Sequence, residues 1–396
     1  MKKRTVVFLA GVALLASGGM CVAHPGHPPL PTPVVSVSAK PQAVPFQLFR
    51  GNRIVVPARI NGHETHVMLD TGASLTTLNR DYARSIGLAP GFKIQAKGAG
   101  GNVDAELISG LTMDLGGYHA ENASIAAMDL APIERAIGMP ISAIFGRDFF
   151  NSAVISIDWA KGQLTVHSHE AFKPSAEATA LTLNKRGPFN TIQVSIAGAA
   201  PVEALFDMGN GGALVMPVTY WKDRPEVANL KSAGAMAGGV GGIHPARAVI
   251  VPQLLLAGQS FANVPAILSE GGNDHEPAQM TNVGIGLLKQ FKVDLDLGRD
   301  RVYLTPRSDK PLFDRDRAGV RFDLLADRLK TSFVSPEGPA AAAGLKPGDE
   351  VTAIDGRPIS ADYYARADWT RSAAGTKVEL TKADGTKLTI TLADFY

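Results

Sequence analysis

Apolar and polar residues alternate in short runs along most of the chain, and turn residues separate these runs. The clearest example is Arg53–Ile60, a run rich in β-branched residues, which is followed by Asn61-Gly62 and then by Thr65–Leu69. An Asn-Gly pair between two such runs is a strong signal for a β-hairpin. A second hairpin is predicted for 155–166, with Lys161-Gly162 at its turn. The pattern therefore predicts a mainly β protein.

The second half of the chain repeats this pattern, with a strand expected at 191–196 and a hairpin around Gly298. Five features recur in the same order at nearly constant offsets, for example 207 − 70 = 137 for the two aspartates and 241 − 100 = 141 for the glycine pairs. A period near 140 residues is too long for a solenoid and indicates two pseudo-symmetric β lobes, at 45–170 and 180–308, that arose by internal duplication. The matched features are Asp70 and Asp207; Gly100-Gly101 and Gly241-Gly242; Leu115, Gly117, Asn122 and Leu256, Gly258, Asn263; Ile144-Phe145-Gly146 and Gly284-Ile285-Gly286; and Ile157-Asp158 and Leu295-Asp296.

Helices are expected to be short. One is predicted at 80–86, where Gly87 closes it. The last part of the chain, 316–396, reads as a third compact module, with a short helix over 339–344 that has proline near its start and glycine at its end. A further helix is expected over 361–372, and a hairpin over 378–392.

Composition excludes several classes of function. The chain has 396 residues, of which 45% are hydrophobic and 19% charged, and this is the balance of a folded protein. The net charge of +2 provides no basic field for nucleic acid. Neither a His-Glu-x-x-His motif nor a phosphate-binding loop occurs, so we expect no metal and no cofactor.

The first residues resemble an export signal. A basic start is followed by an apolar run at 6–16 and by small residues before His24, which predicts a signal peptide at 1–23. The run is too short to cross a bilayer, and no membrane span is expected in the mature chain. Cys21 is the single cysteine, and the bulky Met20 before it argues against a lipoprotein signal. Residues 24–44 are rich in proline and are expected to form an extended linker.

The aspartates are the residues with the clearest chemistry. Val67-Met68-Leu69 precedes Asp70-Thr71-Gly72, so a carboxylate is expected at the end of a buried strand, with Gly72 allowing a tight turn and a small hydroxyl residue of the loop able to hydrogen-bond across to a partner loop. If the two lobes are related by symmetry, Asp207 faces Asp70. Two adjacent carboxylates cannot both ionise cheaply, so one keeps a proton and a water between them can act as a nucleophile.

Residues 45–307 resemble the pepsin-like and retroviral-type aspartic peptidases. The resemblance rests on Leu69-Asp70-Thr71-Gly72 and Phe206-Asp207-Met208-Gly209, and on the apolar-apolar-Gly elements Ile144-Phe145-Gly146 and Val283-Gly284-Ile285-Gly286. It implies a bilobal acid-protease fold, catalytic roles for Asp70 and Asp207, and loop support from Thr71, Gly72, Ser74, Met208 and Gly209. It also implies glycine-rich flaps over the substrate, carried by Gly98, Gly100, Gly101, Gly241 and Gly242.

The second motif departs from the family pattern, because Met208 stands where the family has threonine or serine. One hydroxyl that would link the two loops is therefore missing, at a cost of about 1 kcal/mol, and more if Thr71 is left buried without a partner. Two alternatives stay open. The chain could be a non-catalytic peptide-binding adaptor derived from a protease, or two chains could assemble to pair two copies of Asp70.

The C-terminal module resembles a PDZ domain of the type found in the bacterial envelope. The run from Gly338 to Asp349, followed by Ile354-Asp355-Gly356, carries this resemblance. PDZ domains bind a peptide as an added strand and hold its terminal carboxylate on turn amides. The resemblance implies a peptide groove at Gly319, Val320 and Phe322, with a protein C-terminus as the ligand. A structural module with a closed groove is the alternative.

Together, these features predict an exported aspartic endopeptidase, periplasmic or secreted in a bacterium. It would cleave extended peptide segments of a protein substrate, with recruitment through the PDZ domain.

Overall fold

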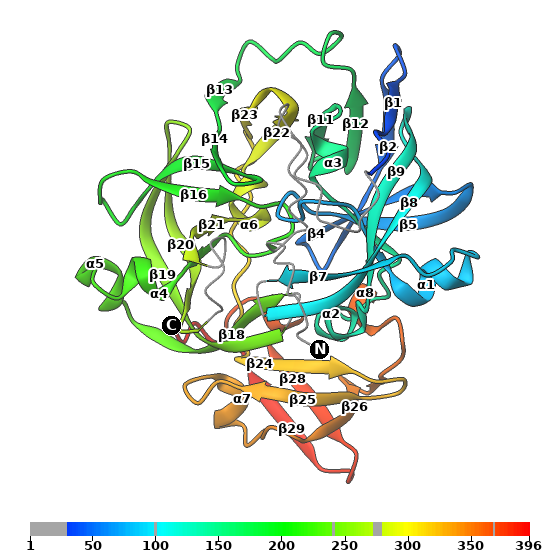
Figure 1. The fold of residues 1–396 in the computed structure, drawn as a ribbon. Coiled ribbons are helices and arrows are strands. Elements are labelled where there is room, and N and C mark those ends of the chain that lie inside the picture. Colours follow the sequence, from blue (N-terminus) through cyan, green and yellow to red (C-terminus); the bar gives the residue numbers. More distant parts are fainter. Residues whose placement is uncertain (1–29, 99–100, 240–241, 272–278, 367–368) are drawn as a thin grey trace, which may run out of the picture.

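The computed structural model describes residues 30–98, 101–239, 242–271, 279–366 and 369–396 (Figure 1). The expected signal peptide lies outside these residues. The prediction of a mainly β protein is confirmed, since strands form four sheets and every helix within the described residues is short. None of these helices is long and apolar enough to cross a membrane.

Lobe 1, at the right in Figure 1, is built on a nine-stranded sheet. Its strand order is β1-β9-β6-β10-β5-β4-β8-β7, with β3 paired to β4. Strand β10 lies between β5, to which it is parallel, and β6, to which it is antiparallel. The strands are β1 (Val34–Val37), β3 (Gln47–Phe49), β4 (Arg53–Ile60), β5 (His63–Leu69), β6 (Thr77–Asn79), β7 (Phe92–Gly98), β8 (Gly101–Leu115), β9 (Tyr118–Met128) and β10 (Ala143–Phe145), and the helices are α1 (Arg80–Ser85), α2 (Ala131–Ile137) and α3 (Arg147–Phe150).

Lobe 2, at the left in Figure 1, repeats this arrangement in an eight-stranded sheet ordered β14-β15-β16-β21-β17-β20-β19-β18. Strand β21 again lies between a parallel neighbour, β16, and an antiparallel one, β17. The strands are β14 (Asn184–Arg186), β15 (Phe189–Ile196), β16 (Val202–Phe206), β17 (Leu214–Met216), β18 (Ser232–Gly239), β19 (Gly242–Leu256), β20 (Gln259–Ser269) and β21 (Thr281–Val283), and the helices are α4 (Val218–Trp221), α5 (Pro225–Ala228) and α6 (Ile285–Leu288).

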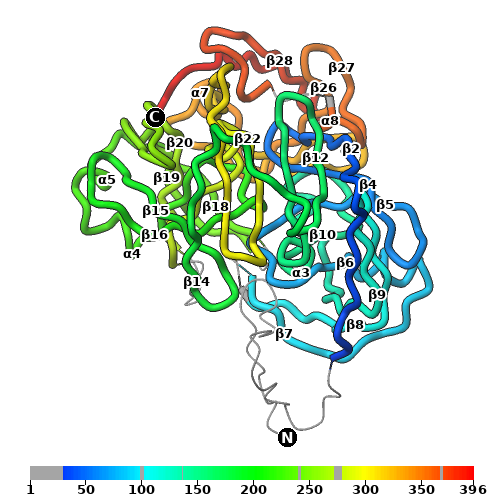
Figure 2. The backbone as a smooth tube through the Cα atoms, turned by 90° about the horizontal axis from the view of Figure 1, so that it is seen from above, coloured from blue at the N-terminus to red at the C-terminus, as the bar shows by residue number. Residues whose placement is uncertain are grey.

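A six-stranded sheet joins the two lobes, in the order β13-β23-β22-β11-β12-β2. Strand β11 of lobe 1 pairs with β22 of lobe 2, with Ser156 opposite Asp294. Figure 2 shows β12 and β22 between the two lobes. Because one apolar core runs through both lobes, they form a single body. The sheet contains β2 (Gln42–Pro45), β11 (Val154–Asp158), β12 (Gln163–His167), β13 (Thr179–Thr182), β22 (Phe291–Asp296) and β23 (Arg301–Pro306), with the 3-10 turn η2 (Leu297–Arg299) before the last strand.

The expectation of an extended linker at 24–44 is wrong for its second part. Residues Val34–Val37 form β1 against β9, and β2 pairs with β12 of the joining sheet. In β1 the side chains of Val35 and Val37 are partly buried and those of Val34 and Ser36 are exposed, so one strand face packs on the protein while the other faces solvent. Pro45 lies at the end of an edge strand, where its missing N–H costs no ladder hydrogen bond.

The turn chemistry explains the predicted hairpins. Strand β4 covers the predicted 53–60, and Asn61 and Gly62 both have positive φ angles, 49° and 76°, as the turn between β4 and β5 requires. The hairpin predicted for 155–166 is the β11–β12 pair.

The C-terminal module, 316–396, forms a separate sheet ordered β24-β25-β26-β28-β29, with β27 paired to β26. The expected helix over 361–372 is shorter than predicted, because only α8 and the 3-10 turn η3 form within the described part of this range. The elements are β24 (Val320–Leu324), β25 (Leu329–Val334), α7 (Pro339–Ala342), β26 (Glu350–Ile354), β27 (Arg357–Pro358), α8 (Tyr363–Arg366), η3 (Trp369–Arg371), β28 (Lys377–Lys382) and β29 (Lys387–Thr391).

This module is docked against lobe 1. The Arg50 guanidinium lies over the Tyr364 ring, 4.1 Å from its centroid, and donates a hydrogen bond to the Ile137 carbonyl at 3.3 Å. Gly138, which ends α2 with φ 86°, packs so closely on Tyr364 that a Cβ atom there would overlap the ring. The side chains of Phe49 and Val55 complete the apolar core of the module.

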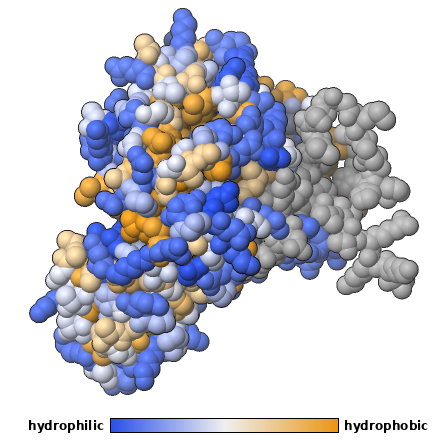
Figure 3. Space-filling model, turned by 90° about the vertical axis from the view of Figure 1, so that its left-hand side faces the viewer, coloured by the Kyte–Doolittle hydropathy of each residue, from blue (hydrophilic) through white to orange (hydrophobic). Residues whose placement is uncertain are grey.

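The module also contacts lobe 2, where the Gly234 N–H in β18 donates to the Glu337 carboxylate at 2.9 Å. Figure 3 shows the module projecting below the lobes, with hydrophobic patches scattered on the lobe face above it. The module therefore bridges both lobes from below (Figure 1).

Replacing Gly138 with alanine tests this docking. Gly87 ends α1 with a similar φ of 80° but has open space around it, so Gly87→Ala is a matched control for backbone strain. Strain alone is expected to cost about 1 kcal/mol of unfolding free energy in each variant. Gly138→Ala should cost more, by about 1–2 kcal/mol, because the new methyl group collides with Tyr364. Chemical unfolding measures both, and limited proteolysis near residues 308–316 should accelerate only in Gly138→Ala. Equal effects in the two variants would show that the contact does not hold the module.

Candidate active site

The two aspartate loops occupy equivalent positions in the lobes. Asp70 follows β5 directly, and Asp207 follows β16. The Asp70 N–H donates to the Phe145 carbonyl at 3.0 Å, and the Asp207 N–H donates to the Val283 carbonyl at 3.0 Å. The end of a parallel neighbour strand, β10 or β21, therefore anchors each aspartate at the boundary between the lobes.

The two carboxyl groups face each other across glycines. Gly72 lies against Asp207, and a Cβ atom on it would come within 2.8 Å of Asp207 Oδ1. Gly209 lies against Asp70 so closely that a Cβ atom would overlap its carboxyl group. Asp70 and Asp207 also share a side-chain hydrogen bond. Any side chain at 72 or 209 would push the carboxyl groups apart, so glycine is required at both positions.

The hydrogen bonds of the pair are unequal. Asp70 Oδ1 accepts one bond from its own loop, from the Gly72 N–H at 2.7 Å. Asp207 Oδ1 accepts from the N–H groups of Gly209 at 2.8 Å and Asn210 at 3.1 Å, and its Oδ2 accepts from Asn282 Nδ2 at 2.6 Å. An ionised carboxylate only accepts hydrogen bonds. The negative charge of the pair is therefore better accommodated on Asp207.

Asp70 is the carboxyl group that keeps a proton. Burial, followed by the nearby charge of Asp207, raises the pKa of Asp70 to about 8, against smaller opposing effects of the Gly72 N–H and the Arg53 guanidinium. At neutral pH the pair thus holds one proton and one negative charge, with the proton on Asp70.

Asn282 contributes to this site and was missed by the sequence reasoning. Its orientation is set by a chain of contacts: Asn210 Oδ1 accepts from the Gly212 N–H at 2.9 Å, so Asn210 Nδ2 points to Asn282 Oδ1 at 2.9 Å. The amide of Asn282 is thereby left to donate toward Asp207.

The expected match of Ile144-Phe145-Gly146 with Gly284-Ile285-Gly286 is wrong by two residues. Strand pairing places Phe145 opposite Leu69 and Val283 opposite Phe206, so Gly146 corresponds to Gly284, at an offset of 284 − 146 = 138. With this register Asn282 replaces Ile144. A polar residue in the apolar-apolar-Gly element of one lobe is the signal that could have identified Asn282.

Thr71 links the loops despite Met208. Its hydroxyl donates to the Phe206 carbonyl at 2.9 Å and accepts from the Met208 N–H at 2.9 Å, so Thr71 is buried with both partners satisfied. The Met208 side chain is fully buried in the apolar core and returns no such bond. Ser74, expected to support the loop, has a buried Oγ with no hydrogen-bond partner among the described residues.

The glycine-rich flap segments are hairpin tips. Gly98 pairs with Gly101 between β7 and β8, and Gly239 pairs with Gly242 between β18 and β19. Gly100 and Gly241 lie outside the described residues. In Figure 1 the arrows of β7 and β18 point toward the middle of the molecule from opposite lobes.

Groups of the module itself occupy part of the predicted peptide groove. The Asp316 carboxylate accepts from the N–H groups of Ala318 at 3.1 Å and Gly319 at 3.0 Å, in the turn expected to hold a peptide carboxylate. The Tyr364 hydroxyl donates to the Phe322 carbonyl at 2.9 Å, and the Phe322 side chain belongs to the core. Val320, at the start of β24, is partly buried and packs against the same core. Strand β24 is still the edge strand of its sheet, with β25 as its strand partner, and these internal contacts occupy part of that edge.

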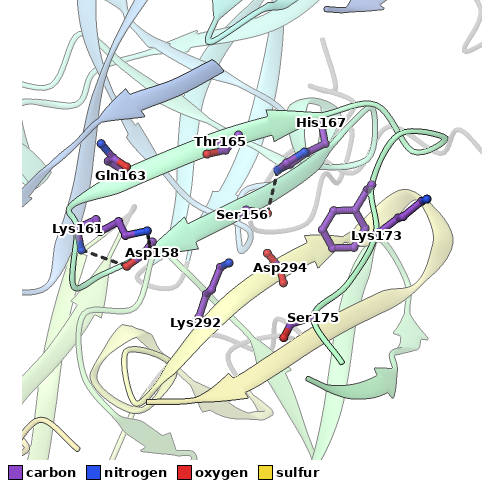
Figure 4. A pocket seen from close by; sticks show the side chains of 11 residues that line it. Ser156, Asp158, Lys161, Gln163, Thr165, His167, Lys173, Ser175, Lys292 and Asp294 are labelled. Atoms are coloured by element: carbon purple, nitrogen blue, oxygen red, sulfur yellow. Dashed lines mark hydrogen bonds and ion pairs between the residues drawn. The ribbon is translucent and has the colours of Figure 1, made fainter. Parts of the chain in front are cut away.

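A cavity of about 220 Å³ lies on the joining sheet and is distinct from the aspartate loops (Figure 4). Its lining is polar and includes Asp158, which pairs with Lys161, and Ser156, which contacts His167 at 3.2 Å. None of the predicted site residues lines this cavity. Within the described residues, no cluster of three histidine, cysteine or acidic side chains could hold a metal ion.

Comparison with known families agrees with both resemblances. Residues 56–149 match the aspartyl protease family model, and residues 332–382 match the PDZ domain model. No curated protein is similar enough to the chain to count as a match. The chain therefore carries an aspartyl protease domain, of the retropepsin-like kind, and a PDZ domain.

The protonation of Asp70 should appear in the stability of the protein. Its pKa is about 8 when folded against about 3.8 when unfolded, so the folded state holds the extra proton and stability falls as pH rises from 4 to 8. Asp70→Asn removes this loss. We expect its unfolding free energy to exceed that of the wild type at pH 8 by about 1 kcal/mol or more, and the gain to shrink toward pH 4.

Denaturant unfolding at several pH values measures the difference. Asp158→Asn, which removes a carboxylate on the joining sheet, is the control and should show no such growth with pH. Parallel pH profiles for the wild type and Asp70→Asn would contradict a protonated Asp70.

Proposed function

We propose that this protein is an exported aspartic endopeptidase that cleaves extended peptide segments with a water activated between Asp70 and Asp207. The observation that carries the proposal is the unequal carboxyl pair, in which Asp207 accepts three N–H donors and Asp70 keeps a proton. An acid and a base held in contact are what attack of water on a peptide carbonyl requires.

In this mechanism Asp207 takes a proton from the water while the water oxygen forms a bond to the substrate carbonyl carbon. Asp70 gives its proton to the carbonyl oxygen, so the tetrahedral intermediate is neutral and the charge moves to Asp70. Collapse breaks the C–N bond, with the proton on Asp207 passing to the leaving nitrogen and one hydroxyl proton returning to Asp70. The pair ends in its starting state.

The hairpins β7–β8 and β18–β19 would cover the substrate from both lobes. Glycines at their tips leave the backbone close to the peptide and free to hydrogen-bond with it. Two such hairpins over a shared site favour an extended chain as substrate, because an extended chain can pair along its backbone on either side.

Export and internal duplication are parts of the same proposal. The basic, apolar and small-residue pattern over 1–23 supports export to the periplasm or beyond, and not lipidation at Cys21. Duplication is supported by the recurrence of one strand order, in which β10 and β21 take equivalent places beside the aspartate strands.

The PDZ domain would recruit a substrate tail or a protein partner. A peptide C-terminus can bind the turn at Gly319 only by displacing Asp316, and it can pair along β24 only if Tyr364 moves. We therefore propose a groove that is closed at rest and opens for its ligand.

Asp316→Ala tests the closed turn. With the internal carboxylate removed, we expect the full chain to bind a fluorescent peptide with a free C-terminus about tenfold more tightly than the wild type does, because two turn amides become free. An amidated peptide should not gain, and Asp314→Ala, which removes a carboxylate paired with Lys289, should behave as the wild type. Tight binding of the free C-terminus by the wild type, unchanged in Asp316→Ala, would show that the groove is open.

The second candidate function is a peptide-binding adaptor that has lost the chemistry. Met208 favours it, because the hydroxyl that would return the Thr71 link is missing and a thioether fills the core instead. Pairing of Asp70 between two chains is not favoured, because Asp207 already occupies the facing position.

Hydrolysis of an unfolded protein substrate, measured from pH 3 to 9, decides between enzyme and adaptor. We expect Asp70→Asn and Asp207→Asn each to lower kcat/KM by at least about a thousandfold, since either change removes the acid–base pair. Asp158→Asn is the control. Activity should also fall as pH rises through about 8, where Asp70 loses its proton.

Full activity in purified Asp70→Asn would overturn the mechanism. Binding of the substrate without cleavage at any pH would identify an adaptor, and Met208→Thr then asks whether restoring the hydroxyl is enough to recover turnover.

A further inference from the structure

Arg53 places a positive charge beside the carboxyl pair. It is the first residue of β4 in lobe 1, and its guanidinium crosses to the aspartate loop of lobe 2, where it packs on Gly211. A Cβ atom at Gly211 would overlap Arg53 Nη1 and lie 2.7 Å from Asn52 Nδ2. The absence of a side chain at 211 is therefore what lets this arginine enter the site.

The guanidinium has few partners for its charge. Nη1 donates to the Asn52 carbonyl at 2.8 Å, and the buried Nε has no hydrogen-bond partner among the described residues. Arg53 also forms no ion pair with a described carboxylate, although the side chain is only partly exposed. A buried or half-buried charge normally has such a partner, since desolvation without one is costly.

The charges around Arg53 come from four segments of the chain. Asp207 and Asp70 attract it from the two loops, while Arg50 of the β3–β4 turn and Arg371 of the PDZ domain repel it. Burial lowers the pKa of Arg53 to about 10, so it remains positive at neutral pH. With Asp70 protonated, the carboxyl pair carries a single negative charge, and three arginines lie on this side of it.

We propose that Arg53 is a specificity-determining residue that binds a carboxylate of the peptide substrate, and that the protein therefore prefers acidic peptides. This inference rests on the proposed peptidase function. The guanidinium presents a planar set of donors that matches a carboxylate, and within the described residues only the Asn52 carbonyl accepts from it. A purely structural role, bridging the lobes, is the alternative that the experiment must exclude.

A carboxylate could come from an Asp or Glu side chain or from the free C-terminus of the substrate. The experiment therefore uses one peptide that the protein cleaves, in a series with a single Glu moved through the positions flanking the cleaved bond. Each member has a twin with Gln at the same position, and each is made with a free and with an amidated C-terminus.

For the wild type we expect one flanking position at which Glu raises kcat/KM over Gln by about tenfold, mainly through KM. In Arg53→Gln this Glu-to-Gln ratio should fall to about one, and Arg53→Lys should keep part of it. Arg59→Gln, which removes an exposed arginine of the same strand that pairs with Glu64, is the matched control and should keep the full ratio. If amidation of the C-terminus lowers kcat/KM and the position of Glu has no effect, the group that Arg53 binds is the substrate C-terminus.

The inference would be overturned if the Glu-to-Gln ratio is the same in the wild type and Arg53→Gln, or if Arg53→Gln lowers kcat/KM for the Glu and Gln peptides by the same factor. Arg53 would then be a bridge between the lobes. Unfolding of each variant in denaturant shows whether a loss of activity comes from lower stability and not from lost substrate selection. If no peptide is cleaved, the proposed function has failed but this inference has not, because anisotropy of the labelled peptides still reports whether Arg53 selects Glu over Gln in binding.

Discussion

Asp70 and Asp207 are held in contact across the boundary between the lobes, and two like charges cannot occupy that space together. The arrangement is tolerable because Asp70 keeps a proton and Asp207 receives three N–H donors. It is sterically possible because the residues that lie between the carboxyl groups are Gly72 and Gly209. Most other features of the two lobes can be understood as ways of maintaining this contact.

The joining sheet is the largest of these features. Pairing of β11 with β22 makes the lobes one hydrogen-bonded body, and a single apolar core extends through both. The loops are then tied directly by Thr71, whose hydroxyl bonds two backbone groups of the other lobe. Since that bond pair is complete without a hydroxyl at 208, the Met208 substitution removes one of two links and leaves no buried polar group unsatisfied in its place.

The turn between β3 and β4 connects the carboxyl pair with the PDZ domain. Arg50, in this turn, packs on Tyr364 of the PDZ domain, and Arg53, three residues later, reaches the loop of lobe 2. The Arg371 guanidinium of the PDZ domain donates to the Arg50 carbonyl at 2.5 Å. A change in the docking of the PDZ domain would therefore act on the segment that positions Arg53.

The sequence by itself determined the aspartate loops, the β4–β5 and β11–β12 hairpins and the PDZ module, because each depends on local signals such as Asn61-Gly62 or an apolar run ending in Asp-Thr-Gly. Only the tertiary structure decided which distant groups meet. Asn282 acquires its role from the parallel pairing of β21 with β16, Arg53 from its crossing to Gly211, and Asp316 from the fold of its own turn against Gly319. These contacts depend on strand register and on the space that a missing side chain leaves. Neither can be read from the residue itself or from its neighbours in the sequence.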